Sequence, residues 1–304
     1  MLRHGASNPV AGTALVLVFV LALLPGAGQP EPASPTRDEH PIPGSLFSFE
    51  EREITSEVSP RQLKARIGRP RGLAVHVATR EPGESRFWAR LPDGWTDGER
   101  CGLLVWCDPT DRGQPPRHYF AAADELRLIL IGVEGAGNER KPWTDRVLLA
   151  LDAIAIARVR WAIDDTRVYV SGMSGGGRIS SILWGVFPDV ITGAVPIVGM
   201  NSYRVLERGT PGTFWPAGYK RPRGKAERLL RTRRLGAITG TDDFNHEQTM
   251  AYIDAMKRDG MAVRAFTVEG MGHTMPPPEV LTEALRWIDD PNRAETVEPA
   301  QGEE

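Results

Sequence analysis

The stretch from Arg167 to Gly177, RVYVSGMSGGG, constrains the fold of this chain more than any other. Val168–Val170 are β-branched and aromatic, which is typical of a short buried strand, and the residues after Gly177 have the pattern of a helix. Between them, the segment GMSGG places Ser174 in a G-x-S-x-G pattern. A serine on such a sharp turn adopts a strained backbone conformation, and the turn leaves no room for Cβ atoms on its neighbours. The stretch therefore predicts either a nucleophilic Ser174 or a glycine-rich turn without chemistry, and partner residues must decide.

Strand and helix patterns alternate along the rest of the chain. Apolar runs predict strands at residues 103–106, 128–133, 193–198, 235–239 and 263–268. Helical periodicity predicts helices over residues 147–162, 247–258 and 279–288. Upstream, residues 73–77 and 86–91 flank a Pro-Gly turn, which is typical of a hairpin. This alternation predicts an α/β fold: a mostly parallel sheet with helices on both faces and an antiparallel hairpin at its start.

The catalytic interpretation of Ser174 requires a histidine nearby, because a serine hydroxyl is a poor nucleophile until a base accepts its proton. His273 directly follows the last predicted strand. Since the carboxyl ends of parallel strands share one edge of a sheet, His273 is expected at the edge that carries Ser174. His246 is the alternative, although its place at the start of a predicted helix is more simply that of an exposed residue.

Two acidic residues could orient this histidine. Asp242 and Asp243 follow the strand predicted at residues 235–239, on a loop at the same sheet edge. The order serine, aspartate, histidine is the α/β-hydrolase order. The competing interpretation is that these acids only cap the next helix, where Asn245 and Gln248 also have the spacing of a capping box.

Several motifs together resemble one family. They are the serine turn with the strand before it, Phe187-Pro188-Asp189, Gly240-Thr241-Asp242-Asp243 and Gly272-His273. Over about residues 72–290 the chain resembles the exported α/β-hydrolases grouped with poly(3-hydroxybutyrate) depolymerases and feruloyl or acetyl-xylan esterases. The resemblance implies the α/β-hydrolase fold and cleavage of carboxylic esters through an acyl-enzyme, without a cofactor. It also implies that Asp243 is the orienting acid.

The sequence departs from this family at the oxyanion hole. The family ends its third strand in His-Gly, and a backbone N–H just beyond supplies half of the hole. Here the corresponding residues are Cys107-Asp108-Pro109-Thr110, and a proline has no N–H to donate. The N–H of Gly175, next after the nucleophile, is the first predicted donor. Thr110, or another N–H of this loop, is the predicted second donor.

Residues 200–234 have the size of a small cap inserted over an active site. Its aromatic residues could line an acyl or aryl pocket or could form the core of the cap, and both interpretations remain open. They are Tyr203, Phe214, Trp215 and Tyr219. The basic run from Lys220 to Arg234 could attract anionic substrates or cell-wall polymers, but a solvated helix face explains it more simply.

The first 28 residues have the pattern of an export signal. Arg3 and His4 precede an apolar run from Val10 to Leu24, and the small residues at 26–28 are suited to cleavage. The run is short for a bilayer span, which needs about 20 apolar residues. We therefore expect an exported protein, periplasmic or extracellular, with no stable membrane span after processing. An N-terminally anchored protein is the alternative.

The remaining segments complete the predicted organisation. Residues 29–71 are predicted to be a Pro-rich linker and a weakly patterned segment, before an α/β-hydrolase domain over residues 72–290. Residues 291–304 are predicted to be a disordered acidic tail.

Net charge and cysteine content indicate whether nucleic acid, a disulfide or a metal is to be expected. A formal net charge of -2 gives no reason to expect nucleic acid. Cys101 and Cys107 lie at opposite ends of one predicted strand, about 20 Å apart, so they cannot form a disulfide with each other and are expected to be free, buried thiols. Neither cysteine belongs to a metal-binding pattern, so no metal is expected.

The sequence thus predicts a serine hydrolase that acts on small-molecule or polymeric esters, with Ser174, Asp243 and His273 as its triad. Two alternatives remain. One is a serine peptidase of the prolyl-oligopeptidase type, which shares the triad. The other is a catalytically inactive hydrolase fold that serves as a binding module, which the departure at Pro109 suggests.

Overall fold

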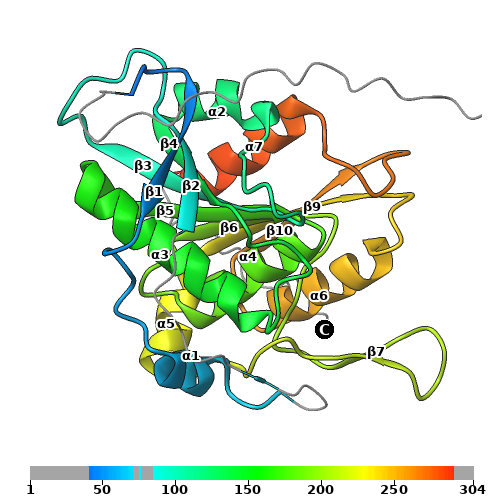
Figure 1. Ribbon diagram of the computed structural model, residues 1–304. Helices are drawn as coiled ribbons and strands as arrows, with labels where there is room; N and C mark the ends of the chain where they lie inside the picture. Colours follow the sequence, from blue (N-terminus) through cyan, green and yellow to red (C-terminus); the bar gives the residue numbers. More distant parts are fainter. Residues whose placement is uncertain (1–40, 71–74, 77–84, 291–304) are drawn as a thin grey trace, which may run out of the picture. The chain divides into compact units, whose positions relative to one another are not determined.

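A computed structural model describes residues 41–70, 75–76 and 85–290, which all belong to one unit over residues 34–304. Its centre is an eight-stranded sheet of order β1-β2-β4-β3-β5-β6-β9-β10 (Figure 1). The strands are β1 (Leu46–Glu51), β2 (Ser85–Arg90), β3 (Cys101–Cys107), β4 (Leu128–Val133), β5 (Ile163–Met173), β6 (Gly193–Ile197), β9 (Arg234–Gly240) and β10 (Val263–Val268). β2 pairs antiparallel with β1 and β4, and every pair from β4 to β10 is parallel. The predicted α/β class is confirmed.

Helices cover both faces of the sheet (Figure 1). The larger core lies against α1 (Pro60–Ile67), α3 (Thr144–Arg160), α4 (Gly175–Val186), α5 (Lys225–Arg231) and α6 (His246–Arg258). The second core lies against a 3₁₀ turn (Arg117–Tyr119), α2 (Phe120–Glu125) and α7 (Pro278–Asp289). Every residue of β3, β4 and β9 is buried, as expected for strands covered on both faces. The sequences of β3 and β4 are accordingly continuous apolar runs, whereas β9 also buries Arg234 and Thr239.

The N-terminal part of the fold differs from the prediction. Residues 45–71 contain β1 and α1, although their sequence is only weakly patterned. β1 pairs with one edge of β2 while β4 pairs with the other, so β2 has no free edge for residues 73–77 and the predicted hairpin is wrong. Of that predicted strand, only Val75 and His76 lie within the described residues. The structured domain therefore includes β1 and α1, upstream of the predicted start at residue 72.

The insertion between β6 and β9 is part of the main core. It contains a small hairpin, β7 (Leu206–Glu207) with β8 (Phe214–Trp215), followed by α5. Tyr203, Trp215 and Tyr219 are buried in the larger core. These three side chains therefore have a packing role and do not line a substrate pocket. Phe214 is exposed.

Two further predictions can be compared with the structure. Cys101 and Cys107 are free and buried, as predicted. Within the described residues, no helix is both long and apolar enough to span a bilayer. The predicted export signal at residues 1–28 and the predicted tail at residues 291–304 lie outside the described residues.

Candidate active site

Ser174 occupies the turn that joins β5 to α4. Its backbone has φ 54° and ψ −115°, in the left-handed half of conformational space that residues with a Cβ rarely adopt. The main chain holds it from both sides, because its N–H donates to Ile197 O at 2.8 Å and its carbonyl accepts from Arg178 N at 3.0 Å. The strained turn predicted from the G-x-S-x-G pattern is therefore present, and it presents Ser174 at the N-terminus of α4.

The glycines around Ser174 are required by close backbone contacts. A Cβ on Gly176 would lie 1.8 Å from the carbonyl oxygen of Cys107, and one on Gly177 would lie 2.3 Å from the carbonyl oxygen of Gly199. Both distances are far below a van der Waals contact. The first turn of α4 can therefore approach β3 and β6 only because it lacks side chains.

The structure brings Ser174, His273 and Asp243 together, as the sequence predicts. His273 Nε2 lies 2.9 Å from Ser174 Oγ, and its Nδ1 lies 2.8 Å from Asp243 Oδ1. Asp243 follows β9 and His273 follows β10, so both come from loops at the carboxyl ends of parallel strands. The Asp243 side chain is fully buried, whereas that of His273 is 26% exposed. This geometry permits proton transfer between serine and imidazole while the carboxylate fixes the other ring nitrogen.

The two alternative residues do not join this group. Asp242 is exposed, and the Thr241 hydroxyl contacts its side chain at 3.4 Å. His246 lies in the first turn of α6, where its Nδ1 is 3.5 Å from Thr239 Oγ1. The loop between β9 and α6 therefore separates the two acids, turning Asp243 inward and Asp242 to solvent.

Arg178 supports the acid loop from α4. Its guanidinium donates to Asn245 Oδ1 and to Gln248 Oε1, both at 2.9 Å, and to Met200 O at 3.1 Å. Asn245 in turn donates to Val198 O at 2.9 Å. The predicted capping box is therefore wrong, because Asn245 makes no side-chain cap and both residues bind Arg178 instead. Burial lowers the pKa of Arg178, and the negative charge of Asp243 opposes that effect.

Phe244 covers one side of the His273 ring. Its ring stacks on the imidazole of His273 with a centroid distance of 4.3 Å and an interplanar angle of 28°. Phe244 is nonetheless 77% exposed, which is unusual for a large apolar side chain. No pattern in the sequence indicates this contact, apart from the position of Phe244 directly after Asp243.

The predicted oxyanion donors differ in their availability. No described residue accepts a hydrogen bond from the N–H of Gly175, so it remains a donor for a ligand. The Thr110 N–H instead donates to Asp108 Oδ1 at 2.8 Å, and the Thr110 hydroxyl bonds the same oxygen at 2.9 Å. In this structure the Thr110 N–H is therefore bonded within its own loop, to the side chain of Asp108.

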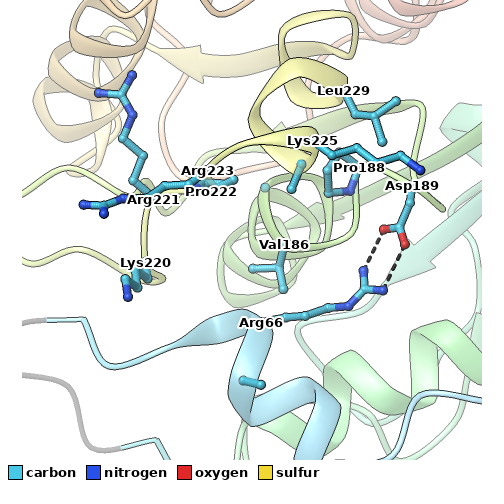
Figure 2. Close-up of a pocket in the computed structure, with 13 residues that line it drawn as sticks. Arg66, Val186, Pro188, Asp189, Lys220, Arg221, Pro222, Arg223, Lys225 and Leu229 are labelled. Carbon is cyan, nitrogen blue, oxygen red and sulfur yellow. Dashed lines mark hydrogen bonds and ion pairs between the residues drawn. The ribbon is translucent and has the colours of Figure 1, made fainter.

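A separate hollow of about 460 Å³ lies at the far end of α4 (Figure 2). It involves Val186, which is roughly 16 Å along the helix from its start. Basic residues of the predicted cap border this hollow, and Arg66 of α1 closes one side through a two-point ion pair with Asp189. The basic run therefore borders a surface remote from Ser174. In the described part of the chain, no cluster of side chains is suited to hold a metal ion.

Known proteins resemble the chain in fold but not in sequence. No protein-family model matches it, and no curated protein matches it in sequence. The S-formylglutathione hydrolase FrmB of Staphylococcus aureus aligns with a TM-score of 0.55 at 12% identity, over 81% of this chain and 99% of that one. The fluorophosphonate-binding serine hydrolase FphF of the same organism aligns with a TM-score of 0.53 at 12% identity, over 82% and 99%.

A candidate dipeptidyl aminopeptidase IV of Bacteroides ovatus also aligns, with a TM-score of 0.52 at 11% identity, over 81% of this chain and 35% of that one. At such identities the likeness concerns the fold alone. Sheet order, strand directions and these neighbours agree, and the chain has the α/β-hydrolase fold.

Proposed function

We propose that the protein is a serine hydrolase that cleaves carboxylic esters through an acyl-enzyme. The observation that carries this proposal is the unbroken contact chain from Ser174 Oγ through His273 to Asp243, built on a strained strand-to-helix turn. Each contact lies within hydrogen-bond distance, and the nucleophile stands at a helix N-terminus, where developing negative charge is stabilised.

In the proposed first half-reaction, Ser174 Oγ attacks the ester carbonyl while its proton passes to His273 Nε2. The tetrahedral intermediate places a negative charge on the former carbonyl oxygen, and the Gly175 N–H faces that oxygen. His273 then gives its proton to the leaving alkoxide, and the acyl-enzyme forms. In the second half-reaction, water attacks the acyl carbonyl while His273 removes its proton. His273 then returns a proton to Ser174 Oγ as the acid product leaves.

Asp243 holds the imidazole in the tautomer that this chemistry needs. Because Asp243 Oδ1 accepts the proton on Nδ1, the lone pair of Nε2 points toward Ser174. The carboxylate also stabilises the imidazolium that forms after proton transfer. It does so from a fully buried position, where a charge interacts more strongly than in water.

The proposal includes the finer assignment to the group of poly(3-hydroxybutyrate) depolymerases and feruloyl or acetyl-xylan esterases. The motifs at the serine turn, at Gly240-Thr241-Asp242-Asp243 and at Gly272-His273 support it. Turnover on p-nitrophenyl 3-hydroxybutyrate, methyl ferulate and acetylated xylan tests this assignment. Faster turnover of aminoacyl-nitroanilides than of any of these esters would favour the peptidase alternative.

We also propose that residues 1–28 direct export. Their charged start, apolar run and small residues support this. Intact-mass analysis of secreted material is expected to find an N-terminus near Gln29. A full-length mass in the membrane fraction would favour the anchored alternative.

The decisive experiment is labelling with a fluorophosphonate probe, which reacts only with an activated serine. The wild-type protein is expected to label at Ser174, and Ser174→Ala is expected neither to label nor to hydrolyse p-nitrophenyl acetate, with an unchanged melting temperature. Loss of several orders of magnitude is expected because the triad acts as a unit. A folded wild-type protein that does not label would instead support the inactive binding module.

A further inference from the structure

The proposed reaction leaves a structural question at the oxyanion hole, and the following inference rests on that proposed function. Two donors normally stabilise the tetrahedral oxyanion, and Gly175 supplies one. Pro109 has no N–H, and the N–H of Thr110 is bonded to Asp108. The loop after β3, which supplies the second donor in the family that the chain resembles, therefore provides none from Pro109 or Thr110 in this structure.

The neighbouring loop, which follows β4, uses its own backbone donors to hold the β3 loop in place. Asn138 N donates to Pro109 O at 2.9 Å, and Gly137 N donates to Asp111 Oδ1 at 2.9 Å. Gly135 N donates to Asp111 O at 2.8 Å. These three N–H groups join the two loops and are not available to a substrate.

The side chain of Asn138, in contrast, lies directly against the nucleophile turn. A Cβ built on Gly175 would lie 1.9 Å from Asn138 Oδ1 and 3.1 Å from Asn138 Nδ2. The amide group is therefore in contact with the residue whose N–H is the first oxyanion donor. This contact also explains why position 175 is glycine, because any side chain there would displace Asn138.

Arg146 of α3 fixes the direction in which this amide points. Its Nη1 donates to Asn138 Oδ1 at 2.9 Å, while its other nitrogens donate to Ala136 O at 2.7 Å and to Asp108 O at 2.9 Å. Arg146 is buried and bound at three points, so it cannot follow a rotating amide. A flipped amide would set its NH₂ group against the guanidinium, donor against donor.

The NH₂ group of Asn138 is consequently directed away from Arg146 and is left without an acceptor in the described structure. Asn138 is also exposed, so these hydrogens can reach a bound substrate. We propose that Asn138 Nδ2 donates the second hydrogen bond to the tetrahedral oxyanion, beside the Gly175 N–H. Arg146 is then a positioning residue, which acts by holding Asn138 Oδ1.

The test compares Asn138→Ala with wild-type protein on p-nitrophenyl acetate. Loss of an oxyanion donor is expected to lower kcat by about 100- to 1000-fold with little change in KM, because the bond forms only when charge develops. Asn138→Asp keeps the shape of the side chain but replaces the donor by an anion, and it is expected to lose at least as much. The matched control is Glu139→Gln, on an exposed neighbour in the same loop, which is expected to stay within about twofold of wild type in kcat.

A second readout separates a catalytic from a structural role. A trifluoromethyl ketone forms a hemiketal oxyanion on Ser174, so its affinity should fall in Asn138→Ala by a factor similar to the fall in kcat. Affinity for a non-reactive substrate-like amide should not change. Should Asn138→Ala fail to fold, Asn138→Asp is judged by the same criteria.

The outcomes distinguish this inference from the proposed function. A folded Asn138 variant that keeps kcat and ketone affinity within about threefold of wild type overturns the role of Asn138, while fluorophosphonate labelling of Ser174 in the same sample upholds the hydrolase. A wild-type protein that neither labels nor turns over ester overturns both.

Discussion

Asp242 and Asp243 are neighbours in the chain, yet the β9–α6 loop gives them opposite environments. Asp243 Oδ1 bonds His273, while Asp242 faces solvent. We expect Asp243→Asn to lower kcat by about 10⁴-fold, because an amide would favour the wrong imidazole tautomer. Asp242→Asn should change kcat by less than about threefold, as expected of a surface substitution. Steady-state kinetics of the two isosteric variants test this, and a reversed ranking would assign the orienting role to Asp242.

The residues of the site differ in how far the sequence alone predicts them. Ser174, Asp243 and His273 each follow a recognisable strand, so topology places them at one edge of the sheet. The contact of Asn138 with Gly175 joins two loops that no local pattern connects. The contact of Arg178 with Asn245 is similar, because no sequence pattern connects a basic residue in a helix with a partner 67 positions away.

The helices and strands also differ in how far the sequence predicts them, and α1 is the clearest case. Leu63 and Ile67 are fully buried in the larger core, and Arg66 bonds Asp189 beyond the end of α4. Ser59 caps the helix with a capping box that spans Ser59 and Gln62. The sequence did not predict α1, because two buried residues in eight give little periodicity. In contrast, β3, β4 and β9 are buried throughout, and their apolar runs were recognisable.

If α1 is an integral part of the domain, weakening its packing against the core should lower the free energy of unfolding. We expect Leu63→Ala to lower the free energy of unfolding by about 2–5 kcal/mol, the usual range for a buried leucine that leaves a cavity. Urea denaturation followed by circular dichroism measures this. Lys64→Ala, on the exposed side of the same helix, is the control and should cost less than about 0.5 kcal/mol. Equal stability of Leu63→Ala and wild type would mean that α1 does not pack as described.

At the scale of the whole molecule, carboxylates paired with arginines connect distant elements and respond to pH. Burial opposes the ionisation of Asp124 and Asp189, but hydrogen bonds from Arg90 and Arg66, respectively, outweigh burial and hold both pKa values below the ordinary range. For Glu99, hydrogen bonds from Arg127 are the main cause of a lowered pKa. The three pairs link β2 to α2, α1 to the end of α4, and the start of β3 to that of β4.

A lowered pKa in the folded state means that unfolding takes up protons. The stabilisation is present above the unfolded pKa values, about 4 for these acids, and is lost as the pH falls through the lower folded values. The melting temperature is therefore expected to be nearly constant from pH 7 to about pH 5 and to fall steadily below that. Calorimetry across this range tests the prediction, with Asp124→Asn expected to flatten the acid slope. A melting temperature that rises on acidification would contradict it.

The position of β10 at the edge of the sheet affects which part of the protein unfolds first. Ser174 is held by interior strands, because its turn binds Ile197 of β6 and the glycines after it pack on β3 and β6. His273 follows β10, which is the last strand of the sheet within the described residues and pairs there with β9 alone. Edge elements open at lower free energy than interior ones. Under mild denaturant we expect the contact between His273 and Ser174 to be lost while most of the sheet is still intact. The proposed esterase activity should then fall before the spectroscopic signals of the fold change.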